Sequence, residues 1–211
     1  ISSIQLTRSQ TRGQSVIESS VLDKTEQYVF YNRSEQYRNG YLEFQVRIFK
    51  DGLCGNLSIS PTKRLCTPYV HLHPYQIEKF TVLQGQFAYQ FGSQISTCDN
   101  VTCPRPVVIP PNTIHTFWMN DNHDDLVVVV HISPIYDDHG LTASSYENVA
   151  GVRRDRYMNL WQAFVLIDDI ESYPIFLPLG FVKVFFRIGS LIGQLLGYQK
   201  EYDAYTTKFF E

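Results

Sequence analysis

The sequence has no long run of basic residues, and its overall charge is slightly negative. Its 211 residues include 18 Lys and Arg against 21 Asp and Glu, which gives a formal net charge of −3. Surfaces that bind nucleic acid need clustered Lys and Arg to contact the phosphates. We therefore predict that nucleic acid is not a partner of this protein.

Long apolar runs are missing as well. A membrane-spanning helix needs roughly 18 or more consecutive apolar residues. The longest candidate, residues 176–197, is interrupted by Lys183 and Arg187, so the sequence disfavours a membrane-spanning role. Aromatic residues are plentiful by contrast, with 14 Phe and 14 Tyr. That content supports a sizeable core and excludes general disorder.

Cysteine is scarce, but the number is even. Four cysteines allow two disulfides in three connectivities, and the simplest joins Cys54 to Cys66 and Cys98 to Cys103. No two cysteines have the two-residue spacing of zinc knuckles, so a zinc site built from all four is disfavoured.

Three N-glycosylation acceptors occur, at Asn32, Asn56 and Asn100. Together with the even cysteine count, they favour the secretory pathway or an extracellular location. Because the sequence begins at Ile1, a signal peptide could have preceded it.

The middle of the chain has the period-two pattern of half-buried strands. Apolar and polar residues alternate over residues 41–48, and short strands bounded by turn residues follow as far as His131. Many short strands of this kind predict a barrel or a sandwich. We expect a β-barrel over residues 41–140, preceded by a partly extended arm over residues 1–40.

After about residue 140 the apolar period becomes helical. One helix is indicated near residues 157–165, and a second over residues 179–196, where Gly197 provides a stop. The second helix is apolar nearly all round, which leaves burial, a dimer contact or membrane-surface contact open. Residues 141–211 are expected to form a helical extension packed on the barrel, and a homodimer is a further expectation.

The most informative residues are three histidines and one glutamate. His71 and His73 project from the same face of one strand because side chains two apart point the same way. Glu78 follows after a bend, Gly85 comes seven positions later, and His115 follows a proline turn at residues 110–112.

These two runs resemble the paired motifs of the cupin superfamily. The first motif matches in the spacing of its histidines, glutamate and glycine, whereas in the second Asn112 replaces a glycine and Asn120 lies one position late. Asn also tolerates positive φ. The resemblance implies a mainly β fold, a cupin jelly-roll β-barrel with an N-terminal arm and C-terminal α-helices.

The resemblance also implies a metal site. The matching ligands are His71, His73, Glu78 and His115, which would hold one divalent metal. Three imidazoles and a carboxylate suit Fe, Mn, Ni, Cu or Zn and leave positions open for water or substrate. A metal-free polar pocket is the alternative interpretation of these residues.

Strand parity extends the candidate site beyond the ligands. We predict that five aromatic residues line a substrate pocket, namely Tyr69, Phe80, Phe87, Tyr89 and Phe117. Ordinary core packing is the alternative for these rings. Glu78, Tyr89 and His131 are candidates for catalysis, although His131 also fits a core histidine.

Two functions remain open. The first is a metal-dependent enzyme that acts on an apolar or aromatic small molecule by oxygenation, or by isomerisation, dehydration or cyclisation, as in natural-product metabolism. The second is a non-catalytic secreted cupin that binds a small molecule or has a germin-like structural role.

Overall fold

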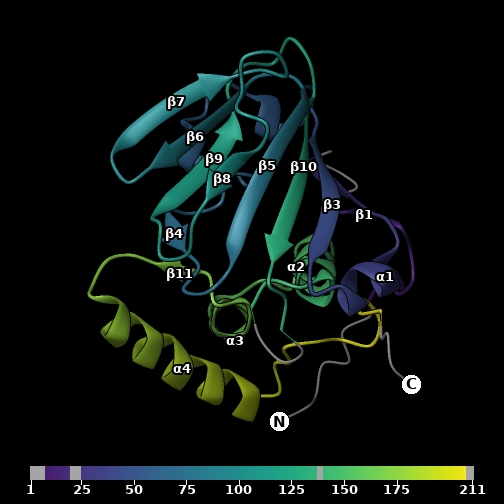
Figure 1. Cartoon of the computed structure of the whole chain (residues 1–211). Coiled ribbons are helices and arrows are strands. Elements are labelled where there is room, and N and C mark those ends of the chain that lie inside the picture. The colour runs from purple at the N-terminus through teal and green to yellow at the C-terminus, as the bar shows by residue number, and fades with distance from the viewer. Residues whose placement is uncertain (1–7, 20–24, 137–139, 208–211) are drawn as a thin grey trace.

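The chain folds into two antiparallel sheets that face each other, with three longer helices at one end (Figure 1). The computed structural model describes residues 8–19, 25–136 and 140–207. The larger sheet has the strand order β1-β2-β3-β10-β5-β8. Its strands are β1 Val16–Glu18, β2 Glu26–Phe30, β3 Leu42–Ile48, β10 Leu126–Ser133, β5 Ile77–Gln84 and β8 Val107–Ile109.

The smaller sheet has the order β11-β4-β9-β6-β7. Its strands are β11 Tyr173–Pro174, β4 His71–Leu72, β9 His115–Met119, β6 Phe87–Phe91 and β7 Gln94–Cys98. The predicted mainly β jelly roll with C-terminal helices is confirmed, although the two sheets do not close into one continuous barrel.

The core lies between the sheets and follows from the alternation read in the sequence. On β10 every second residue from Leu126 to Ile132 is buried, and the residues between them face outward. Phe44 of β3 and Phe80 of β5 are fully buried on the same inner side. Burying a large apolar side chain contributes roughly 1.5–3 kcal/mol, so this face holds the sheets together.

The segment before residue 41 takes part in the larger sheet. β1 pairs with β2, and β2 pairs with β3, both antiparallel. A short helix, α1 (Arg33–Arg38), connects β2 to β3. The domain boundary placed at residue 40 stays a prediction.

Two disulfides close loops between strands. Cys54 is bonded to Cys66, with Cα atoms 5.8 Å apart, in the β3–β4 connection, which also contains the 3₁₀ turns η1 (Leu53–Gly55) and η2 (Pro61–Lys63). Cys98 is bonded to Cys103, with Cα atoms 4.9 Å apart, between β7 and β8. The simplest of the three connectivities is therefore confirmed.

The C-terminal part contains α2 (Ala143–Arg154), α3 (Leu160–Ile170) and α4 (Leu179–Leu195). The apolar pattern did not isolate α2, because that helix buries polar residues such as Glu147 and Asn148. α3 begins later than expected, where the Asn159 side chain accepts a hydrogen bond from the Gln162 amide. α4 has almost the predicted bounds, and Gly197 follows it at φ 94°, as a glycine just past a helix end does.

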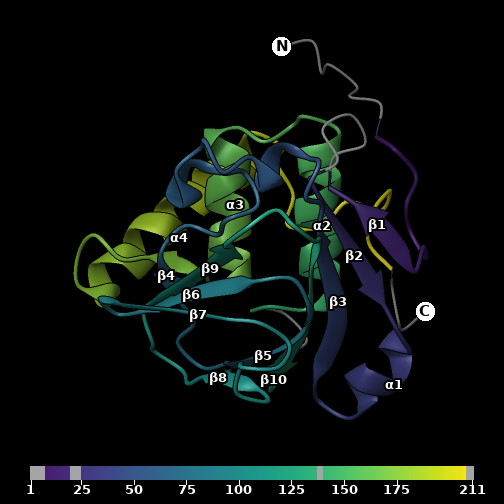
Figure 2. The same ribbon diagram turned by 90° about the horizontal axis from the view of Figure 1, so that it is seen from above.

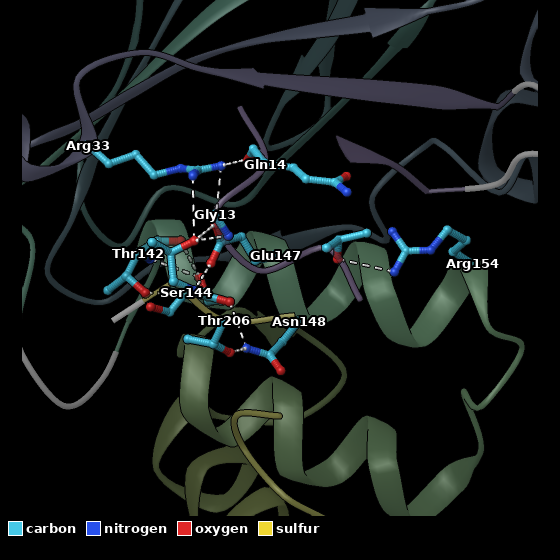
Figure 3. Close-up of polar contacts among 12 residues, drawn as sticks. Gly13, Gln14, Arg33, Thr142, Ser144, Glu147, Asn148, Arg154 and Thr206 are labelled. Carbon is cyan, nitrogen blue, oxygen red and sulfur yellow. Dashed lines mark hydrogen bonds and ion pairs between the residues drawn. The ribbon is translucent and has the colours of Figure 1, made fainter. Parts of the chain in front are cut away.

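A buried polar network joins α2 to both ends of the described chain (Figure 3). Glu147 pairs with Arg33 at 3.1 Å and accepts a hydrogen bond from the Thr207 amide at 2.6 Å. Asn148 donates to Thr206, and Arg154 donates to Thr11. Burial raises the pKa of Glu147 from its ordinary value, and the Arg33 charge acts in the opposite direction. Segments far apart in the sequence are thereby fixed around one helix.

The three helices lie on one side of the sheets, with α3 between α2 and α4 (Figure 2). α4 packs on α3 and lies at the edge of the molecule in both views. Within the described residues, no helix combines the length and apolar character needed to cross a bilayer.

Candidate metal centre

Four potential metal ligands converge between the two sheets. His71 lies on β4 and is paired across the ladder with His115, the first residue of β9. His73 directly follows β4, so the three histidines lie on, or directly after, strands of the smaller sheet. Glu78 lies on β5 of the larger sheet, on the same buried face as Phe80. The candidate site therefore lies where the two sheets face each other.

The ligand atoms are close enough to share one ion. One atom from each of the four residues lies within 4.8 Å of every other. The Nε2 atoms of His71 and His73 are 3.1 Å apart, and Nε2 of His115 is 3.1 Å from Oε2 of Glu78. Nε2 of His73 is 3.9 Å from the same carboxylate oxygen. All four side chains are at most 5% exposed.

Backbone carbonyls orient two of the imidazoles. Nδ1 of His71 lies 2.6 Å from the carbonyl oxygen of Tyr69, and Nδ1 of His115 lies 2.8 Å from that of Thr113. Since a carbonyl only accepts, each Nδ1 carries the proton and each Nε2 presents its lone pair. Histidine ligands in metal sites are commonly oriented in this way.

Burial favours the neutral form of His71 and His73. It lowers the pKa of His71 to about 3, and the nearby His115 contributes in the same direction. Burial likewise lowers the pKa of His73 well below its ordinary value. Neutral imidazoles next to a carboxylate are the form in which these residues ligate a divalent ion. The donor set therefore fits one bound metal.

Two turn residues hold the ligand strands in place. Gly85 has φ 78°, and a Cβ atom there would lie 2.6 Å from the backbone oxygen of Asp125. Asn112 has φ 60°, so it adopts the positive φ expected where it replaces glycine. Its amide donates to the carbonyl of His73 at 2.7 Å, and its side chain donates to that of Pro74. This turn ties the loop before β9 to the end of β4.

Four of the five predicted pocket residues form one aromatic cluster. The ring of Phe80 lies 5.0 Å from that of Phe117 and 5.4 Å from that of Phe87, which in turn lies 5.5 Å from Tyr89. Phe80 and Phe87 are fully buried. Phe80 and Phe117 each lie two residues after a metal-ligand candidate on the same strand, so the cluster adjoins the ligands. Whether a substrate contacts these rings stays a prediction.

Tyr69 has a different setting from the other four. Its ring meets His71 edge-on with centroids 5.4 Å apart, and its hydroxyl donates to the carbonyl of Ser172 at 2.5 Å. Ser172 directly precedes β11, which pairs with β4. Tyr69 therefore joins a ligand strand to the C-terminal extension.

His131 does not join the metal centre, which corrects its place among the catalytic candidates. It follows the buried Val130 on β10, so its side chain points to the outer face of the sheet. There it stacks on Tyr41 and lies 3.3 Å from a carboxylate oxygen of Glu43. Its position at the end of an apolar strand suggested the interior, but strand parity places it outside.

Sequence reasoning missed Tyr146 and Arg153, both on α2. Tyr146 packs its ring 4.3 Å from that of Phe44, and burial together with the Glu78 charge raises its pKa well above the ordinary value. Arg153 pairs with the buried Glu26 at 2.7 Å. Burial raises the pKa of Tyr69 to about 12, and the charge of Arg153 acts in the opposite direction. Because α2 was not isolated in the sequence, only its packing reveals these residues.

The three glycosylation candidates Asn32, Asn56 and Asn100 are exposed. Their accessibility fits the acceptor sequence, and modification itself stays a prediction.

Comparisons with known proteins give relatives named as oxidoreductases. The protein named probable oxidoreductase virH of Hypocrea virens is 30% identical over 154 residues, which are 67% of this chain and 68% of that protein. An oxidoreductase of Arthrobotrys oligospora is 26% identical over 155 residues, 66% of this chain and 60% of that protein. The chain thus spans about two thirds of the first relative's length and less than two thirds of the second's.

Among solved structures, the Cnp3 cupin domain of Schizosaccharomyces pombe matches with a TM-score of 0.38 and 8% identity. The match covers 52% of this chain and 65% of that domain. No family profile matches the chain.

Proposed function

We propose that this chain, which belongs to the family of the probable oxidoreductase virH, is a metal-dependent enzyme of the cupin type that acts on an apolar or aromatic small molecule. The observation that carries the proposal is the buried convergence of His71, His73, His115 and Glu78 within 4.8 Å. Burying polar groups costs free energy because they lose their hydration. A buried cluster of three histidines and one glutamate therefore indicates a function that offsets this cost.

The chain's own residues have definable tasks in this proposal. The three imidazoles and Glu78 would hold one ion of Fe, Mn, Ni, Cu or Zn. When bound, such an ion supplies Lewis-acid or redox chemistry at its open positions. The rings of Phe80, Phe87 and Phe117 exclude water and offer apolar contact to a substrate. Tyr89, at the edge of these rings, is the candidate for moving a proton.

Oxidation is the reaction class that the relatives' names favour, and oxygenation of the substrate is its simplest form in such a site. The proposal is tested by measuring metal content and oxygen uptake with purified protein and candidate phenolic substrates. Oxygen consumption that matches substrate loss is expected. Substrate turnover under strict anaerobiosis would remove oxygenation and leave isomerisation, dehydration or cyclisation.

A non-catalytic secreted cupin is the second candidate, and the two disulfides favour it. Disulfides persist mainly in oxidising compartments, and the exposed acceptors at Asn32, Asn56 and Asn100 fit the secretory route. A bound small molecule that copurifies and stays chemically unchanged after long incubation with the metal-loaded protein would support this function over catalysis.

A further inference from the structure

The outer face of α4 is an apolar surface that the other described residues leave uncovered. We define the α4 stripe as the eight large apolar residues of this helix and its end that are 40–87% exposed. They are Phe181, Val184, Phe185, Ile188, Leu191, Ile192, Leu195 and Leu196. Both views place this helix at the edge of the molecule (Figures 1 and 2).

The opposite face of α4 is already satisfied by packing on α3. Val182 and Phe186 are buried there. A Cβ atom at Gly189 would lie 2.5 Å from the ring of Phe164, and one at Gly193 would lie 2.7 Å from Val165. These two glycines let the helices approach closely. This face of α4 is therefore closely packed on α3, and the stripe is the face that stays exposed.

The stripe is larger than an isolated soluble chain normally exposes. Phe176 extends it, since its ring meets that of Phe185 with centroids 6.1 Å apart. From the exposed fractions, the whole patch presents on the order of 1,000 Å² of apolar surface, against about 300–600 Å² for the largest patch of a typical monomer. A standard protein interface buries about 800 Å² on each partner, so the patch has the size that a stable dimer needs.

The spacing of the stripe fits another helix. Phe181, Val184, Ile188, Leu191 and Leu195 follow one another at intervals of three, four, three and four residues. This is the heptad spacing with which two helices interlock their side chains. We propose that α4 forms a homodimer interface by packing its stripe against the α4 stripe of a second copy.

A lipid surface is the weaker occupant because α4 lacks the free basic residues of membrane-surface helices. Its two charges are engaged with the body of the molecule. Lys183 donates to the Tyr75 hydroxyl at 3.2 Å, and Arg187 pairs with Asp168 at 3.1 Å. None of the eight residues of the stripe is charged, so two stripes meet without like charges opposed.

The first test compares solution mass in the wild type and in a variant of the stripe. The whole chain should have twice its 24.4 kDa mass in light scattering coupled to size exclusion. Ile188→Glu should give the monomer mass and weaken the dimer on the order of 100-fold, since a hot-spot contact is replaced by two buried charges. Ile95→Glu is the matched control, because Ile95 lies 62% exposed on β7, away from the stripe.

The second test uses a cross-link that does not depend on disrupting the fold. In a two-fold dimer the central residue of the stripe lies next to its own copy, whether the helices run parallel or antiparallel. All four native cysteines are paired, so Ile188→Cys adds a single thiol. It should form an intermolecular disulfide on mild oxidation, whereas Ile95→Cys should not.

Three results would overturn the proposal. A wild type that stays monomeric at high concentration has no such interface, and a dimer that survives Ile188→Glu uses another face. A monomer that floats with anionic vesicles, and loses flotation on Ile188→Glu, uses the stripe for membranes. The proposal does not depend on the metal centre, so its failure leaves the proposed activity unaffected.

Discussion

His115 begins β9 and His131 lies near the end of β10, yet only His115 faces the space between the sheets. His115→Ala removes a proposed ligand atom, Nε2, which lies 3.1 Å from Oε2 of Glu78. We expect metal affinity to fall by more than about 100-fold, because loss even of groups that orient ligands costs 10–100-fold. Elemental analysis and metal titration of the purified variant measure this loss.

His131→Ala is the matched control for that substitution. Its side chain stacks on Tyr41 on the outer face, so the variant should keep the wild-type metal content. Equal metal content in both variants would contradict the assigned ligand set. His71→Ala should behave like His115→Ala.

Gly85 is required at its position for two reasons. It has φ 78°, and an added Cβ would lie 2.6 Å from the Asp125 oxygen. Gly85→Ala should therefore lower the free energy of unfolding by about 2–3 kcal/mol in urea denaturation. Gly92→Ala is the comparison: φ is 56°, but no atom lies within 4 Å of its added Cβ. Gly92→Ala should lower the free energy of unfolding by only about 1 kcal/mol. Equal losses in the two variants would rule out the close contact at Gly85 as the cause.

At the scale of elements, the two disulfides should differ in their contribution to stability. Cys54 and Cys66 are separated by 12 residues, and Cys98 and Cys103 by 5. In the chain-entropy account a longer loop restricts the unfolded chain more, which gives about 3 and about 2 kcal/mol respectively. Urea denaturation of the two Cys→Ser double variants measures the difference. A larger loss for the shorter loop would favour effects in the folded state instead.

The strands were predictable because their chemistry is local. Alternation over residues 41–48 reports one buried face, and the motif resemblance predicted one site for His71, His73, Glu78 and His115, which lie on or beside β4, β5 and β9. The disulfide pairing was also accessible, since neighbouring cysteines close short loops. Except for His115, which lies 37 positions after Glu78, these features depend on residues no more than 12 positions apart.

The features that could not be predicted from the sequence depend on contacts between distant segments. α2 buries Glu147 against Arg33, so its inner face does not look apolar. Tyr146 reaches the core only because this helix docks there. The orientation of His131 followed from the parity of β10, which becomes certain only once its partners β3 and β5 are known.

At the scale of the whole molecule, the four proposed ligands come from both sheets. Glu78 comes from the larger sheet, and the three histidines lie on or directly after strands of the smaller one, so an ion held by all four would fasten one sheet to the other. A ligand that binds only the folded state stabilises it by about 2.7 kcal/mol when its free concentration is 100 times Kd. Removing the ion should therefore loosen the molecule as a whole, and not only empty a site.

Chelation of the metal should lower the melting temperature of the wild type by roughly 5–10 °C, as expected for a chain of this size. Calorimetry with and without chelator measures this shift, and restoring the ion should reverse it. His115→Ala should melt at the same temperature under both conditions, because it no longer holds the ion. The stripe on α4 contains none of the four ligands, so the solution mass should not change on chelation. A chelator that separated the dimer would show that the two sites are coupled through α3 and β11, the elements that lie between them.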